Sequence, residues 1–484
     1  MNCRNVAFCG ITLALASALP LAAATCESLT SLTLPHATVT SAQTENGVCR
    51  AAATIRPTSD SEILMEVWLP LQGWNGKLEA NGNGGWTGSI SAQTLAAGAA
   101  RGYASAMSDL GHEGSSASFA LGHPEKLVDF GHRAAHESAV AAKAIVAAYY
   151  GNAPRLSYWT GCSAGGRSAL MEAQRYPADF DGIVAGAPGL NWTGRALLAI
   201  RIAQAAHRNE ESYIPPDKYP AIHAAVLNAC DARDGVKDGV LEDPTRCDFD
   251  PKELLCRSAA DATCLTAPQV ETARAIYSAV INPQTKKSVV PGFERGSELG
   301  WATMAGPKPF TIGVDLFKYV VFQDPSWDFR AFNLDTDLAR MYKAENGLLN
   351  AMNPDLSAFK ARGGKLIQYH GWNDPQIAPS TSVEYYKSVL EKMGGAAKVN
   401  DFYRLFMVSG MAHCRGGEGA STFDMVDALE QWVEHDKAPA HIAASRVRNG
   451  VADRTRPLCP YPQIARYKGS GSIDDAANFS CKLP

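Results

Sequence analysis

The chain has 484 residues, of which 46% are hydrophobic and 19% are charged, and its formal net charge is −4 at pH 7. This composition is typical of a globular protein and excludes a disordered or fibrous chain, while the length suggests about three domains. Basic residues form no stripe along the sequence, so nucleic acid is not expected as a partner.

The N-terminal segment, 1–24, differs in kind from the rest of the chain. Arg4 is its only charged residue, and an apolar run over 6–21 ends in three alanines. This pattern predicts a secretory signal peptide, although an uncleaved anchor and a lipoprotein attached at Cys26 are alternatives. No later stretch is apolar and long enough to span a bilayer, so we expect an exported protein, periplasmic or secreted, that binds no membrane after cleavage.

The cysteine content agrees with export. Two of the 12 cysteines lie in the predicted signal peptide, which leaves an even number in the mature chain. An even number in an exported protein predicts disulfides. The sequence has no C-x-x-C and no pair of Cys/His groups at zinc spacing, so zinc is not expected.

The segment 25–190 alternates short apolar runs with glycine turns and helical stretches. Strands are expected at 62–69, 77–80, 103–107, 156–159 and 183–185, and helices at 129–150 and 167–174. Strands that alternate with helices predict a parallel sheet with helices on both faces.

The pattern changes at 191–355, which holds four cysteines, a cluster of aspartates and many aromatic residues without the pattern of a long sheet. It resumes in 356–484, with strands expected at 365–369 and 403–408 and a helix at 422–435. We therefore expect one α/β domain, 25–190 and 356–484, interrupted by a lid at 191–355.

A nucleophile is predicted at Ser163. Gly161-Cys-Ser163-Ala-Gly165 lies between an expected strand and an expected helix, which is the context that the G-x-S-x-G nucleophile elbow requires. The turn is so tight that its flanks tolerate little side chain, and the helix N-terminus beside the serine favours developing negative charge. The alternative interpretation is an ordinary glycine-rich turn.

A serine nucleophile needs a histidine base oriented by a carboxylate, and in this type of fold both follow the serine, acid first. Asp374 comes after the strand expected at 365–369, and His413 comes after the strand expected at 403–408. We predict these two as acid and base. The alternatives are Asp335, Asp337 and Asp424 for the acid and His370 for the base.

The oxyanion that forms when a serine attacks a carbonyl group needs backbone donors. The N–H of Ala164 is the first candidate. The glycine loop 81–86 follows the strand expected at 77–80 and offers a second donor, Gly84 or Gly85, unless the loop is a plain turn.

The cysteines beside the predicted catalytic pair carry a family resemblance. Cys162 precedes Ser163 and Cys414 follows His413, and this CS-D-HC arrangement resembles the tannase and feruloyl esterase family over nearly the whole mature chain. The resemblance implies an α/β-hydrolase fold with a large inserted lid, a Ser163–His413–Asp374 triad and a disulfide beneath it. The implied disulfides are Cys162–Cys414, Cys26–Cys49, Cys230–Cys247, Cys256–Cys264 and Cys459–Cys481.

A cluster of three aspartates within eight residues of the lid predicts a cation site. Such carboxylates repel one another unless a hard cation binds, and the pattern is not that of an EF-hand. The family resemblance implies structural calcium, Ca2+, and the alternative is a solvated acidic turn. The implied ligands are the side chains of Asp231, Asp234 and Asp238 and the carbonyls of Val236 and Val240.

These features predict a secreted serine carboxylesterase that forms an acyl-enzyme and uses no organic cofactor. The aromatic-rich lid favours a small aromatic ester, first a feruloyl or other hydroxycinnamoyl ester, free or attached to polysaccharide or polyester fragments. Gallate esters, and terephthalate monoesters as cleaved by mono(hydroxyethyl) terephthalate hydrolase, are alternatives. The last would need a cation, for which Arg257, Arg295 and Arg330 are candidates. An alternative of another class is a non-catalytic calcium- or carbohydrate-binding module, and the oligomeric state is left open.

Overall fold

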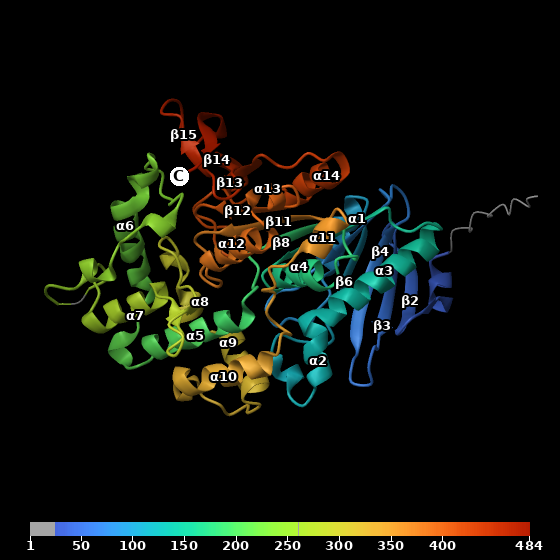
Figure 1. Cartoon of the computed structure of the whole chain (residues 1–484), viewed down its shortest axis with the longest axis horizontal. Coiled ribbons are helices and arrows are strands. Elements are labelled where there is room, and N and C mark those ends of the chain that lie inside the picture. Colours follow the sequence, from blue (N-terminus) through green and yellow to red (C-terminus); the bar gives the residue numbers. More distant parts are fainter. Residues whose placement is uncertain (1–24, 260) are drawn as a thin grey trace, which may run out of the picture.

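The computed structural model describes residues 25–259 and 261–484, so the predicted signal peptide lies outside the described residues. A ten-stranded sheet runs through the molecule in the order β1-β2-β3-β4-β6-β5-β7-β8-β11-β12 (Figure 1). Its strands are β1 (Thr33–Leu34), β2 (Ala37–Glu45), β3 (Val48–Ile55), β4 (Ile63–Pro70), β5 (Lys77–Asn81), β6 (Ala104–Ser108), β7 (Leu156–Cys162), β8 (Gly182–Gly186), β11 (Lys365–Gly371) and β12 (Tyr403–Val408).

The sheet has an antiparallel part and a parallel part. From β1 to β6 every pairing is antiparallel, and from β6 to β12 every pairing is parallel. The strand predicted at 62–69 is β4 and belongs to the antiparallel part, whereas the other predicted strands form the parallel part. Strands β1 to β3 were not predicted. In the parallel part all carboxyl ends meet at one edge, where ligands bind in open α/β sheets.

Helices cover both faces of the parallel part. Neighbouring residues of each strand point to opposite faces: Trp159 and Leu366 pack in one core cluster with residues of α4 and α12, and Tyr158 and Ile367 pack in another with residues of α14. The helices around the sheet are α1 (Ala92–Ala100), α2 (Pro124–Val128), α3 (Ala134–Tyr150), α4 (Ala164–Arg175), α11 (Ser357–Ala361), α12 (Ser380–Met393), α13 (Ala396–Val399) and α14 (Met425–His435).

The segment 191–355 is inserted between β8 and β11, which are neighbours in the sheet. It forms a mainly helical body to one side of the sheet, coloured green to yellow in Figure 1. Within its described residues the only sheet is the hairpin of β9 and β10. Its elements are α5 (Trp192–Ala206), α6 (Tyr219–Cys230), α7 (Ala267–Tyr277), β9 (Val280–Ile281), β10 (Ser288–Val290), α8 (Ala302–Ala305), α9 (Thr311–Asp315) and α10 (Leu334–Glu345).

All three predicted helices begin differently from expectation. The helix expected at 167–174 is α4, which begins three residues earlier, at Ala164. The helix expected at 129–150 opens with a π-helical turn before α3, and it ends at Gly151, whose φ of 75° is left-handed. The helix expected at 422–435 begins only at Met425, because the Asp424 carboxylate caps it by accepting hydrogen bonds from two backbone N–H groups.

The chain ends in strands that stay outside the main sheet. β13 (Ile442–Arg448) pairs with β14 (Val451–Leu458), and β15 (Ile464–Tyr467) pairs with β16 (Phe479–Lys482). The sequence did not predict these hairpins. Across the part of the chain that the structure describes, no helix has the length and apolarity needed to cross a membrane.

Candidate active site

Ser163 lies at the turn between β7 and α4. Its backbone has φ 63° and ψ −118°, a region that non-glycine residues seldom adopt and that costs about 1–3 kcal/mol. Such strain persists only where the surrounding structure fixes it and is typical of nucleophile elbows. The side chain is mostly buried, at 7% exposure.

The glycines around Ser163 are required by close backbone contacts. A Cβ atom built on Gly161 would lie 2.5 Å from the carbonyl of Gly165, and one on Gly82 would lie 2.4 Å from the Cα of Gly165. No side chain fits at these distances. The elbow therefore packs directly against the loop that follows β5.

Asp374 lies after β11 and is completely buried. Its Oδ2 atom is 2.7 Å from His413 Nδ1 and 3.1 Å from His370 Nε2, and its Oδ1 atom accepts hydrogen bonds from the backbone N–H groups of Gln376 (2.8 Å) and Ile377 (3.0 Å). Burial alone would raise the pKa of this carboxyl, but the two imidazoles hold it well below its ordinary value. The Asp374 carboxylate is therefore an anion that only accepts hydrogen bonds.

His413 lies in the loop after β12, and its side chain is 12% exposed. The disulfide between Cys162 and Cys414 joins the residues next to Ser163 and His413, with their Cα atoms 6.0 Å apart. Because Asp374 occupies Nδ1, Nε2 is the ring nitrogen left to accept a proton. Among the described residues the hydroxyl of Ser163 forms no hydrogen bond, and such contacts often close only with substrate bound.

The alternative acids lie in other surroundings. Asp335 and Asp337 lie in the first turn of α10, and Asp424 caps α14 at the surface. The alternative base, His370, has both ring nitrogens engaged, by Asp374 and by the Ser382 hydroxyl at 2.7 Å. Of the candidate acids, Asp374 is the one that the structure brings to His413.

The oxyanion candidates lie on both sides of the elbow. Ala164 begins α4, so its N–H belongs to the first turn, which has no intrahelical acceptor. Gly85 is close to the lid, because a Cβ atom there would lie 3.0 Å from Ile312 Cδ1. Gly84 has open space beside its Cα, with nothing within 4 Å, which leaves room for a bound group. The second donor stays a prediction, and the free space favours Gly84.

Two buried arginines near the site were not predicted. Arg195 of α5 donates from Nε to the carbonyl of Gln376 at 3.0 Å, while its two terminal nitrogens are buried and have no hydrogen-bond partner among residues 25–259 and 261–484. Burial lowers its pKa to about 10, against a raising influence of Asp374. Arg167 of α4 donates to the carbonyls of Gly131 and Phe130. The mainly apolar helix α5 contains two basic residues, Arg195 and Arg201, so residue type alone does not single out Arg195.

The aspartate cluster of the lid is held by its own backbone. The Asp231 carboxylate accepts hydrogen bonds from the N–H groups of Asp238 and Gly239, and Asp234 accepts one from Val236. Asp238 pairs with Arg456. Burial, and then repulsion by Asp238, raise the pKa values of Asp231 and Asp234, the latter to about 6.

This cluster has the oxygen-rich chemistry that calcium prefers, but its carboxylates are already engaged. Within residues 25–259 and 261–484, no group of three or more His, Cys, Asp or Glu side chains is placed to hold a metal ion. Calcium therefore stays a prediction.

The five disulfides of the structure have the pairings that the family resemblance implies. They are Cys26–Cys49, Cys162–Cys414, Cys230–Cys247, Cys256–Cys264 and Cys459–Cys481. Four of them close loops of 8 to 23 residues, and Cys162–Cys414 spans 252 residues.

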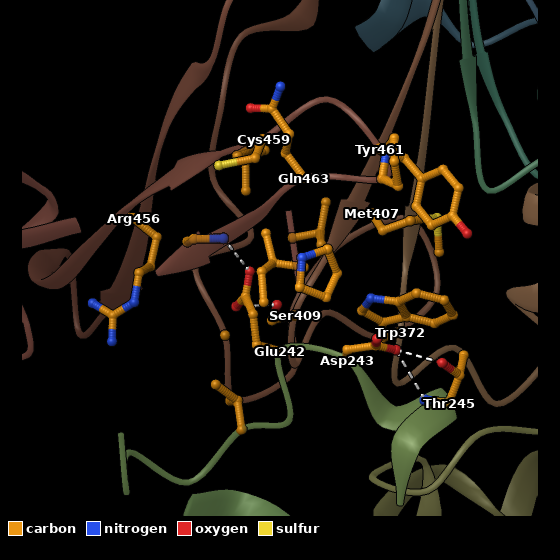
Figure 2. Close-up of a pocket in the computed structure, with 18 of the residues that line it drawn as sticks. Glu242, Asp243, Thr245, Trp372, Met407, Ser409, Arg456, Cys459, Tyr461 and Gln463 are labelled. Atoms are coloured by element: carbon orange, nitrogen blue, oxygen red, sulfur yellow. Dashed lines mark hydrogen bonds between the residues drawn. The ribbon is translucent and has the colours of Figure 1, made fainter. Parts of the chain in front are cut away.

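A cavity of about 250 Å³ lies between the lid, the ends of β11 and β12 and the C-terminal hairpins (Figure 2). Its walls include Trp372, Met407 and Tyr461, and Glu242 borders it between the Ser409 hydroxyl (2.5 Å) and the backbone N–H of Ala465 (2.8 Å). None of the predicted catalytic residues lines it. It therefore lies apart from the predicted catalytic residues.

The three lid arginines considered for a substrate carboxylate are engaged elsewhere or exposed. Arg295 donates to the carbonyl of Phe249 and lies over the ring of Tyr277. Arg330 pairs with Asp328 at the surface, and Arg257 is exposed. Their contacts give no support to a terephthalate monoester as substrate.

Comparison with known proteins gives a consistent result. Residues 49–482 match the family model described as "Tannase and feruloyl esterase". The chain is 38% identical to an uncharacterized esterase of Xanthomonas campestris pv. campestris, over 99% of this chain and 94% of that protein. It is 34% identical to a probable feruloyl esterase B-2 of Neosartorya fischeri, over 93% and 90%.

Solved structures agree. Feruloyl esterase B from Aspergillus oryzae superimposes with a TM-score of 0.89 at 31% identity, over 94% of this chain and 99% of that one. The tannin acyl hydrolase from Aspergillus niger superimposes with a TM-score of 0.76 at 23% identity, over 93% and 90%, which supports the fold.

Proposed function

Because the chain belongs to the tannase and feruloyl esterase family and is therefore a carboxylic ester hydrolase with the α/β-hydrolase fold, we propose that it cleaves aromatic acid esters with Ser163 as nucleophile. The observation that carries this proposal is the linked arrangement around the elbow. A disulfide joins the neighbours of the strained Ser163 and of His413. The buried carboxylate of Asp374 holds the His413 imidazole, with 2.7 Å between Oδ2 and Nδ1.

In the proposed reaction, Nε2 of His413 takes the proton of the Ser163 hydroxyl as its oxygen attacks the ester carbonyl carbon. The tetrahedral intermediate collapses, the bond to the alkoxy oxygen breaks, and the imidazolium gives its proton to the leaving alcohol. Water then attacks the acyl-enzyme by the same route and releases the acid. Asp374 stays ionised and stabilises the imidazolium in both halves of the reaction.

The negative charge on the former carbonyl oxygen needs donors fixed in advance. We assign the N–H of Ala164 and, from the loop after β5, the N–H of Gly84 or Gly85. The contact between Gly82 and Gly165 supports this assignment, because it fixes that loop against the elbow.

For the acyl group we propose a hydroxycinnamoyl ester, with ferulate first. The support is that relatives similar over nine-tenths of both chains are named feruloyl esterases. A galloyl ester is the alternative that the family leaves, and a terephthalate monoester is a weaker one. Export from the cytoplasm is part of the same proposal, because five disulfides fit an oxidising compartment.

The test compares the mature protein on methyl ferulate, methyl gallate and mono(hydroxyethyl) terephthalate under the same conditions. We expect kcat/KM to be highest on methyl ferulate, and a far higher value on either other ester would overturn the substrate assignment. Hydrolysis of p-nitrophenyl acetate by wild type and by Ser163→Ala tests the nucleophile. A fall of at least about a thousandfold is expected, and equal background rates in both proteins would favour a non-catalytic module.

A further inference from the structure

Asp374 is shared by two histidines. His413 and His370 both contact the same oxygen, Oδ2, at 2.7 and 3.1 Å. On its far side, His370 is 2.7 Å from the hydroxyl of Ser382 in α12. The structure therefore contains a chain of four side chains, Ser382–His370–Asp374–His413, of which the first three are completely buried.

The direction of the hydrogen bonds follows from the charge of Asp374. An ionised carboxylate only accepts, so His370 donates its Nε2–H to Oδ2. A neutral imidazole then has a free lone pair on Nδ1, and the Ser382 hydroxyl donates to it. Ser382 thus fixes the tautomer of His370 in the way that Asp374 fixes that of His413.

We propose that His370 is a positioning residue of the esterase, which tunes how strongly Asp374 binds the proton-accepting His413. This proposal rests on the proposed function of Ser163, Asp374 and His413. Two donors on one oxygen share its electron density. The hydrogen bond from His370 therefore weakens the stabilisation that Asp374 gives to the His413 imidazolium. It also holds the carboxylate plane, together with the two backbone N–H groups on Oδ1.

The charged and titratable groups that the structure places against Asp374 come from three elements. They are His370 at the end of β11, His413 in the loop after β12, and Arg195 of α5, whose Nε bonds the Gln376 carbonyl. Arg195 is unchanged in the variants proposed below, so its charge acts equally on all of them.

The test compares wild type with His370→Leu, His370→Gln and Ser382→Ala on the ester that wild type hydrolyses best. His370→Leu removes the donor that holds the plane of the Asp374 carboxylate, so we expect kcat to fall about tenfold or more with KM nearly unchanged. We also expect the acid limb of the kcat/KM profile to move to higher pH, because Asp374 then stabilises the imidazolium more. His370→Gln keeps a donor for Oδ2 and should recover most of both effects. Ser382→Ala should move the acid limb in the same direction by less.

His132→Leu is the matched control. This partly buried histidine lies 2.7 Å from the Tyr176 hydroxyl, with which it forms a hydrogen bond, and it does not belong to the triad. We expect it to leave the acid limb in place. An unmoved acid limb in both His370→Leu and Ser382→Ala, with wild-type kcat, would overturn the proposal. If His370→Leu does not fold, Ser382→Ala decides alone. Wild-type hydrolysis is measured first, so failure of the proposed function is seen separately, as an inactive wild type.

Discussion

At the scale of single residues, the site is organised around a buried anion. All the hydrogen bonds that the structure gives the Asp374 carboxylate are donated to it, by two imidazoles on one oxygen and two backbone N–H groups on the other. Its ionised form is thus stabilised although burial opposes it. The carboxylate is therefore a fixed negative charge throughout the pH range in which histidine titrates.

This charge makes stability depend on pH in a defined direction. The folded-state pKa of Asp374 lies below the unfolded value of about 3.9, so the stabilisation is present above that value and is lost as pH falls toward the folded pKa. Asp374→Asn cannot titrate. We expect the Tm difference between wild type and Asp374→Asn to be widest near pH 7 and to narrow below about pH 4.

Thermal unfolding followed by circular dichroism from pH 3 to 7 measures this difference. Asp424→Asn, a surface cap of α14, is the control for losing a carboxylate outside the site. A Tm difference between wild type and Asp374→Asn that stays constant down to pH 3 would contradict the lowered pKa of Asp374. In Asp374→Asn, kcat should fall about 10⁴-fold, because the imidazole of His413 loses the anion that fixes its tautomer.

At the scale of elements, the sequence predicted the parts that have strong local signals. The parallel strands are buried on both faces and read as short apolar runs, and the elbow carries its own glycines. β2 and β3 were missed because their alanine, serine and threonine residues give no clear alternation. The start of α14 was placed three residues early because a capping aspartate, rather than the apolar period, sets it.

The prediction of the site rested on the order of residues along the chain and did not extend to contacts between elements. Ser163, Asp374 and His413 follow one another in the order that the fold requires, and the structure brings Asp374 and His413 together. The bond between His370 and Ser382, and that between Arg195 and Gln376, join different elements. Such contacts depend on packing and have no signal in sequence spacing.

The Cys162–Cys414 disulfide joins two elements of the site, and its removal is a test at this scale. The loop-entropy model assigns roughly 5 kcal/mol to closing a loop of that length and roughly 2.5 kcal/mol to one of eight residues. We expect Cys162→Ser with Cys414→Ser to lower Tm and to reduce kcat, because His413 is no longer tied to the elbow.

Cys256→Ser with Cys264→Ser is the matched control, since that disulfide closes an eight-residue separation within the lid. It should lower Tm less and leave kcat near the wild-type value. Equal loss of kcat in the two double variants would show that the first disulfide has no special role in the geometry of the site. Differential scanning fluorimetry and hydrolysis of the best ester measure the two effects.

The aspartate cluster of the lid gives a second test at this scale. A bound cation would relieve the repulsion between Asp231, Asp234 and Asp238, so calcium should stabilise the folded lid. We expect EDTA to lower Tm by several degrees and added calcium to restore it. Asp234→Asn should abolish this response, whereas Asp243→Asn, which alters a neighbouring capping residue, should keep it. A Tm that is insensitive to both EDTA and calcium would exclude a structural calcium site.

At the scale of the whole molecule, the lid and the sheet share a core. One cluster of buried residues contains Ile55 and Val67 of the antiparallel strands, Trp86 of the loop after β5, and Trp301 and Phe317 of the lid. The indole N–H of Trp86 donates to the carbonyl of Ile312 in the lid at 3.0 Å. The lid is thus inserted in sequence but continuous with the sheet in its packing.

This continuity predicts cooperative unfolding. Far-ultraviolet circular dichroism, tryptophan fluorescence and loss of activity should give coincident transitions in guanidinium chloride, with no folded sheet left after the lid unfolds. The control is the same titration after the predicted stabilising calcium has been removed. A first transition in which tryptophan fluorescence reports an unfolded lid while the sheet stays folded would contradict a shared core.

The connectivity of the disulfides has a consequence for how the protein must be made. Four bridges join cysteines that are consecutive within residues 25–484, whereas Cys162 and Cys414 are separated in sequence by four other cysteines. In the export that we propose, those four cysteines would emerge before Cys414 does. An oxidase that pairs thiols in order of emergence would trap Cys162 with the wrong partner. We therefore expect an expression strain without a disulfide isomerase to yield oxidised but inactive protein, and a strain with such an isomerase to yield active protein.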